Sequence, residues 1–149
     1  MKKLSLIMVL VLFSVAGAVA QIYNPVTWSV ASKKLSNNEA VVFVKATIER
    51  GWNIYGLQVP DGGPISTSFK FTPSKEYTLN GKVAAPAPKS KFEKLFNMDV
   101  PYYINEVTFQ QKIKLNKGQT SVKGVVEFMA CDNERCLPPE EYAFTVTIK

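Results

Sequence analysis

The only two cysteines of this 149-residue chain, Cys131 and Cys136, lie five positions apart near its carboxyl end. They follow an apolar run that ends at Ala130, and Pro138-Pro139 comes shortly after them. Two cysteines at this spacing can change between a dithiol and a disulfide with little change elsewhere in a fold. The pair is therefore either a redox site or a small structural staple.

The rest of the composition leaves few other chemistries open. The chain has no histidine, which excludes Ser-His and Cys-His catalysis and histidine metal sites. Two cysteines cannot form a four-cysteine zinc site, and Asp61-Gly62-Gly63-Pro64 is typical of a turn rather than of a phosphate-binding loop. We therefore expect no metal and no small-molecule cofactor, and we assign the chemistry to the cysteines.

Spacing and charge do not decide between a redox site and a staple. In an exported protein, two cysteines usually form a stabilising disulfide. Closing so short a loop removes chain entropy worth only about 2 kcal/mol, which makes the pair a weak staple. Arg135 would favour a thiolate at the neighbouring Cys136, whereas Asp132 and Glu134 would oppose it. Both interpretations remain open at this point.

The first twenty residues predict export. Lys2-Lys3 precedes an apolar run, Leu4 to Val15, and Ala18-Val19-Ala20 matches the small-x-small pattern of signal-peptide cleavage. A membrane anchor is the alternative, but the apolar core is short for a bilayer span. We predict a signal peptide over residues 1–20 and a mature, soluble protein over residues 21–149, located in the periplasm or secreted.

The charge balance gives no indication of nucleic-acid binding. The formal charge is +6 for the whole chain and +4 without the two lysines of the predicted signal peptide. Nucleic-acid binding would call for a basic stripe with interleaved aromatic residues, and the lysines are scattered instead. We expect no nucleic-acid partner.

Alternating apolar residues predict strands along most of the chain, since alternate residues of a strand face opposite sides of a sheet. Separate turn signals such as Asn80-Gly81 and Asn116-Lys117-Gly118 divide the segments. Together they predict one all-β domain, a β-sandwich with one wet face on each sheet. The clearest alternating sets are Val42, Val44, Ala46 and Ile48; Val107, Phe109, Gln111, Ile113 and Leu115; Val122, Gly124, Val126 and Phe128; and Tyr142, Phe144, Val146 and Ile148.

Shorter segments are weaker strand candidates, and one stretch breaks the pattern. The candidates are Val26 to Ser32, Trp52 to Val59, Ile65 to Phe71 and Tyr77 to Val83. Between the last of these and Val107 lies a proline-rich stretch, Ala84 to Lys89. The residues after it, Ser90 to Asn97, are predicted to form one or two helical turns within a long connection. Ordered connections of this length often carry function.

The segment from Glu127 to Glu140 resembles the active-site segment of the amino-terminal periplasmic domain of DsbD, a transmembrane thiol:disulfide interchange reductase. The shared pattern is a strand, a cysteine, a short polar loop, a second cysteine, an apolar residue and Pro-Pro-Glu. Gly51-Trp52-Asn53-Ile54-Tyr55 resembles a glycine-aromatic-x-aliphatic-tyrosine strand of the same family. The cysteine loop departs from the better-known members because it holds four residues instead of five.

The resemblance implies an immunoglobulin-like β-sandwich that works as an exported electron relay. Its pair, Cys131 and Cys136, would carry reducing equivalents to or from thioredoxin-fold periplasmic proteins, including those of cytochrome c maturation. Because the chain ends at Lys149, we expect the electron donor to be a separate membrane thiol reductase. The alternative is an immunoglobulin-like binding or adhesion module with an inert structural disulfide.

The resemblance also implies roles for individual residues. Cys136 corresponds to the cysteine that attacks a partner disulfide, and Cys131 to the one that resolves the mixed disulfide. The family has a cap loop whose phenylalanine shields the pair, and Phe96 is its counterpart here, with Phe92 as the second choice. Tyr55 would line the site from a neighbouring strand.

Overall fold

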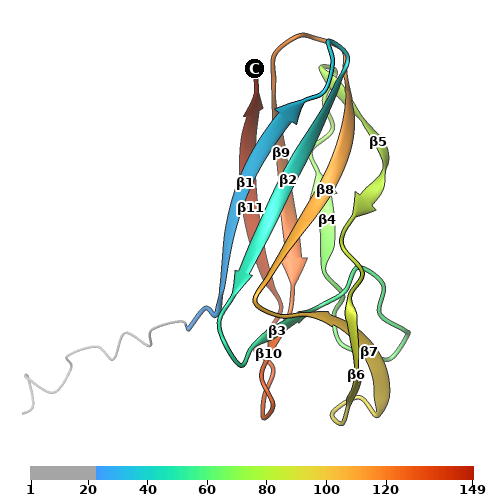
Figure 1. Ribbon diagram of the computed structural model, residues 1–149, viewed down its shortest axis with the longest axis vertical. Coiled ribbons are helices and arrows are strands. Elements are labelled where there is room, and N and C mark those ends of the chain that lie inside the picture. Colours follow the sequence, from blue (N-terminus) through green and yellow to red (C-terminus); the bar gives the residue numbers. More distant parts are fainter. Residues whose placement is uncertain (1–22) are drawn as a thin grey trace, which may run out of the picture.

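The computed structural model describes residues 23–149, so the predicted signal peptide over residues 1–20 lies outside the described residues. The described chain is built from strands joined by turns and loops (Figure 1). No helix in this part of the chain is long and apolar enough to cross a membrane. The strands are β1 (Val26–Lys34), β2 (Glu39–Ile48), β3 (Asn53–Tyr55), β4 (Ser68–Phe71), β5 (Tyr77–Ala84), β6 (Lys89–Glu93), β7 (Met98–Tyr103), β8 (Glu106–Leu115), β9 (Thr120–Phe128), β10 (Ala130–Cys131) and β11 (Glu140–Ile148).

The strands form three antiparallel sheets. A four-stranded sheet in the order β1-β2-β8-β5 lies over a three-stranded sheet in the order β11-β9-β4 (Figure 1). A second four-stranded sheet, in the order β10-β3-β7-β6, lies at the end of the sandwich opposite the carboxyl terminus. We call this last one the end sheet. The prediction of an all-β sandwich is confirmed.

The core follows the alternation seen in the sequence. The predicted inward residues of β2 and β8 are buried, and Val122, Val126 and Phe128 of β9 face them from the other sheet. Phe109 lies at the centre, where its ring centroid is 5.0 Å from that of Phe69 and 5.8 Å from that of Tyr103. Its side chain therefore joins one residue from each of the other two sheets to β8.

The prediction of helical turns over residues 90–97 is wrong. Strand β6 pairs with β7 in antiparallel register from Lys89–Tyr102 to Glu93–Met98, and only residues 94–97 form the turn. A helix would have required Phe92 and Leu95 to face the core, but these side chains are 57% and 62% exposed. Both side chains lie on the open side of a hairpin instead.

Candidate functional site

The two cysteines lie opposite each other at the base of a short hairpin in the end sheet. Cys131 ends β10 and forms an antiparallel bridge with Cys136, and a disulfide joins their sulfur atoms. The backbone N–H of Leu137 donates to the carbonyl of Ala130 at 2.9 Å and closes the hairpin below the disulfide. The structure thus joins the predicted pair in a disulfide, next to β10 at the end of the sandwich opposite the carboxyl terminus (Figure 1).

The loop between the cysteines is held by the carboxylate of Asp132. Its Oδ1 atom accepts the backbone N–H groups of Glu134 and Arg135, each at 2.8 Å. These two hydrogen bonds lower the pKa of Asp132, because they favour its ionised form. The backbone N–H of Asp132 also donates to the carbonyl of Arg135 at 2.9 Å. The loop therefore has hydrogen bonds of its own that do not depend on the disulfide.

We predict that Asp132→Ala weakens the preference of the pair for the disulfide. Without the carboxylate the reduced loop is less ordered, so the two thiols meet less often and the dithiol–disulfide equilibrium constant falls on the order of fivefold. Titration against glutathione measures this constant. Asp132→Asn is the matched control, since it keeps the side-chain oxygen acceptor, and a fall as large as in the alanine variant would contradict the prediction.

The same contact carries a pH dependence. A carboxyl group whose pKa is lowered by folding stabilises the fold above its unfolded pKa, and this contribution is lost as the pH falls through the lowered value. The loop contribution of Asp132 is therefore complete at neutral pH and is lost only in acid.

The two cysteines differ in their exposure. Cys131 is 1% exposed and lies opposite Asn53 of β3, inside the end sheet. Cys136 is only half-buried: it lies outside the strands in an isolated bridge, and Pro138-Pro139, which lack backbone N–H donors, follow it. A partner can reach the sulfur of Cys136 more readily than that of Cys131.

Tyr55 lies directly behind Cys136. Its side chain is fully buried, and its hydroxyl oxygen is 3.9 Å from the Cys136 Sγ atom and donates to Glu93 Oε2 at 3.2 Å. Burial, followed by the charge of Glu93, raises the pKa of Tyr55, so the hydroxyl keeps its proton at neutral pH. The structure thus places the predicted lining residue where it can donate a hydrogen bond to a thiolate.

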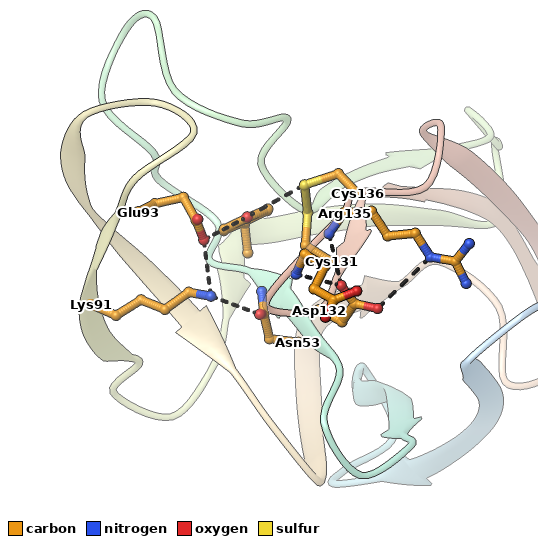
Figure 2. Close-up of a disulfide and its surroundings, with 9 residues drawn as sticks. Asn53, Lys91, Glu93, Cys131, Asp132, Arg135 and Cys136 are labelled. Atoms are coloured by element: carbon orange, nitrogen blue, oxygen red, sulfur yellow. Dashed lines mark hydrogen bonds and ion pairs between the residues drawn. A yellow bond between two sulfur atoms is a disulfide. The ribbon is translucent and has the colours of Figure 1, made fainter.

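Sequence reasoning missed the charged pair behind Tyr55. Lys91 and Glu93 both lie on β6, and Lys91 Nζ is 2.9 Å from Glu93 Oε2 and 2.9 Å from Asn53 Oδ1 (Figure 2). Alternate residues of a strand share one face, which puts both side chains on the same side of the hairpin. The predicted helical turn over this segment hid that signal.

Phe96 lies in the turn between β6 and β7 and is half-buried. The apolar cluster at the site consists of Tyr55, Val100 and Cys131, with Val59, Met98, Tyr102, Met129 and Cys136 packed against it. Phe96 is not among these residues, whereas Met98 is. The shielding role of Phe96 stays a prediction.

The guanidinium of Arg135 does not lie beside the Cys136 sulfur, where it could have favoured a thiolate. Its guanidinium carbon is 5.8 Å from the centre of the Trp52 ring, and Tyr23 packs on the same ring at 5.5 Å between centroids. Figure 2 shows the side chain extending away from the disulfide. Within residues 23–149, no three acidic or cysteine side chains converge to hold a metal ion.

These features define a class of protein: a β-sandwich that presents one close cysteine pair on a hairpin at its end. Residues 25–148 match the family described as thiol:disulfide interchange protein DsbD, N-terminal, and the chain belongs to this family. Family membership and the Cys131–Cys136 disulfide together support thiol–disulfide exchange as the chemistry of the domain.

Solved structures show the same immunoglobulin-like fold. The N-terminal periplasmic domain of ScsB from Proteus mirabilis is 17% identical with a TM-score of 0.63, over 83% of this chain and 46% of that one. The chain thus spans less than half the length of that structure. The reduced DsbD N-terminal domain of Neisseria meningitidis is 18% identical with a TM-score of 0.52, over 79% and 83% of the two chains.

A third solved structure is a complex between the DsbD N-terminal and the PilB N-terminal domains from Neisseria meningitidis. It is 17% identical with a TM-score of 0.54, over 84% of this chain and 87% of that one. The comparison with curated proteins found no match. The predicted fold class, an all-β immunoglobulin-like sandwich, is confirmed.

Proposed function

We propose that this domain is an exported electron relay that exchanges its Cys131–Cys136 disulfide with thioredoxin-fold partners. The observation that carries the proposal is the placement of the pair. One cysteine is buried in the end sheet, the other is half-buried at the rim, and a hydroxyl donor lies behind the half-buried one. A disulfide that served stability alone would not need this asymmetry.

The proposed reaction moves two electrons to the partner. The Cys136 thiolate attacks one sulfur of the partner disulfide, so a mixed disulfide forms and the other partner sulfur leaves as a thiolate. The Cys131 thiolate then attacks Cys136 Sγ, which breaks the mixed disulfide and releases the second partner thiolate. The domain ends as the Cys131–Cys136 disulfide, and the partner ends as a dithiol after taking up two protons. The reverse sequence carries electrons the other way.

The proposed partners follow from the family. A membrane thiol reductase would return the domain to its dithiol, and periplasmic thioredoxin-fold proteins, including those of cytochrome c maturation, would take the electrons. Two comparisons support this setting: the ScsB domain is described as periplasmic, and a DsbD N-terminal domain forms a complex with another protein domain. We propose the periplasm as the location, with residues 1–20 as the signal peptide.

The reduction potential of the pair tests the proposal. A relay must be reducible by cellular dithiols, so we expect a potential above roughly −300 mV, measured by equilibration with glutathione or dithiothreitol. A lower value would mark a disulfide that resists reduction. It would favour the alternative, an immunoglobulin-like binding module with an inert disulfide.

A further inference from the structure

We propose that Lys91 is a positioning residue for thiol–disulfide exchange: by pairing with Glu93, it keeps the hydroxyl of Tyr55 available to the Cys136 thiolate. This inference rests on the proposed function, because it concerns the reactivity of the cysteine that would attack the partner. Lys91 lies on β6, far in sequence from the cysteine segment.

Lys91 lies at the centre of a fixed set of contacts. Its ammonium nitrogen is 2.9 Å from the carboxylate of Glu93, 2.9 Å from the amide oxygen of Asn53 and 5.2 Å from the centre of the Tyr102 ring. Its side chain is 26% exposed and that of Glu93 only 11%. Contacts from β3, from the adjacent strand β7 and from its own strand β6 hold this lysine, unlike a surface lysine, in one position.

The pairing matters because Glu93 and Cys136 share one donor. The Tyr55 hydroxyl has a single proton and lies within reach of both the Glu93 carboxylate, at 3.2 Å, and the Cys136 sulfur, at 3.9 Å. In the disulfide state the sulfur is a weak acceptor and the carboxylate takes the hydrogen bond. Once Cys136 is a thiolate, the two anions compete for the donor and repel each other.

Lys91 changes the outcome of that competition. By neutralising Glu93, it weakens the hold of the carboxylate on the Tyr55 proton and cancels much of the repulsion felt by the thiolate. The thiolate of Cys136 is then stabilised by a hydrogen bond from Tyr55. A mostly buried Glu93 carboxylate without its cation would do the opposite.

The charged residues directly beside the two cysteines, Asp132 and Arg135, are engaged elsewhere, and Glu134 is exposed to solvent. Asp132 accepts two backbone hydrogen bonds within its own loop, and Arg135 lies over Trp52. Tyr102 offers only its ring face to Lys91. The Lys91–Glu93 pair is therefore the charged unit that acts on Cys136 through Tyr55.

The test uses the Cys131→Ser protein, in which Cys136 is a lone thiol, and measures its alkylation by iodoacetamide as a function of pH. We expect Lys91→Met to move the midpoint upward and to slow alkylation at pH 7 about tenfold, the effect of one pKa unit. Lys91→Arg should largely restore the rate. Lys94→Met removes the same charge from the exposed turn of the same hairpin and should change the rate less than about twofold.

Repeating the Lys91 substitution in a Glu93→Gln protein shows whether Lys91 acts by neutralising Glu93 or simply as a nearby positive charge. There, Lys91→Met should leave the alkylation rate nearly unchanged, because no carboxylate remains to be neutralised. This comparison also serves if the Lys91→Met protein does not fold, since the double variant has no unpaired buried carboxylate. A tenfold loss in the Glu93→Gln background, or an equal loss in Lys94→Met, would overturn the inference.

The result is independent of the relay proposal itself. Alkylation reports the thiolate of Cys136 without any partner protein, whereas the relay depends on the reduction potential of the intact pair. A reduction potential below roughly −300 mV, together with an alkylation rate of Cys136 that depends on Lys91, would reject only the relay. A reducible pair, together with an alkylation rate of Cys136 that does not change when Lys91 is replaced, would reject only the role of Lys91.

Discussion

A reduced Cys131→Ser protein is expected to form a stable covalent adduct with a thioredoxin-fold partner, and a Cys136→Ser protein is not. The probe is a thioredoxin with its second active-site cysteine replaced by serine and its first carrying a nitrothiobenzoate group. Attack by Cys136 forms a mixed disulfide and releases the nitrothiobenzoate thiolate, which is followed by its absorbance. Without Cys131 nothing resolves this adduct, so it accumulates and is detected by mass spectrometry.

The expected difference between the two variants comes from their exposure. Cys136 is half-buried at the rim, whereas Cys131 is 1% exposed and lies under the hairpin. We expect release of the thiolate to be at least on the order of tenfold slower in Cys136→Ser. The reduced wild-type protein is the control: it should release both the nitrothiobenzoate and the free thioredoxin and end as its own disulfide. Equal rates in the two variants would contradict the assignment of Cys136 as the attacking cysteine.

The sequence predicted the sandwich because its core strands obey one simple rule. Each of β2, β8 and β9 has one buried face and one face that is mostly exposed or half-buried, and period two is the direct consequence of that geometry. Val41 of β2 is the exception, because it is buried on the outward face. Even Gln111, a polar residue in an apolar set, is buried as its position implied, and its amide donates to the carbonyl of Gly81 at 3.1 Å.

The end sheet was less predictable because its strands are short and paired across long sequence distances. β3 has three residues and β10 two, which is too few for a period to be visible. The pairing of Asn53 with Cys131 joins positions 78 residues apart. No local pattern specifies such a contact. The family resemblance indicates Tyr55, whereas the charged pair behind it, Lys91 and Glu93, can be found only from the fold.

The predictable and the unpredictable parts of the structure lie in different sheets, which have different roles. The two sheets of the sandwich bury most of the apolar core, to which the end sheet adds Ile54, Tyr103 and Ala130. The end sheet also gathers Tyr55, Lys91 and Glu93 around the cysteine hairpin. The electrostatic environment of Cys136 is therefore built from residues of the end sheet that lie outside the main core cluster.

The largest loss of stability is expected from Phe109→Ala. The Phe109 side chain is 1% exposed, and its ring packs against Trp28, Phe69 and Tyr103, so truncation leaves a cavity where the three sheets meet. We expect a loss of about 3–5 kcal/mol in the free energy of unfolding, measured by chemical denaturation with the disulfide intact. The midpoint should fall without a change in the denaturant slope, because the surface exposed on unfolding is nearly the same.

The neighbouring residue provides the matched control for this prediction. Gln110 lies on the same strand but points outward, so Gln110→Ala should change the free energy of unfolding by less than about 0.5 kcal/mol. Phe109→Leu should lie between the two variants, since it removes the aromatic contacts but fills much of the cavity. If Phe109→Ala cost no more than Gln110→Ala, the ring could not be what joins the sheets, and the stability of the sandwich would have to come from the aliphatic residues of β2 and β9 alone.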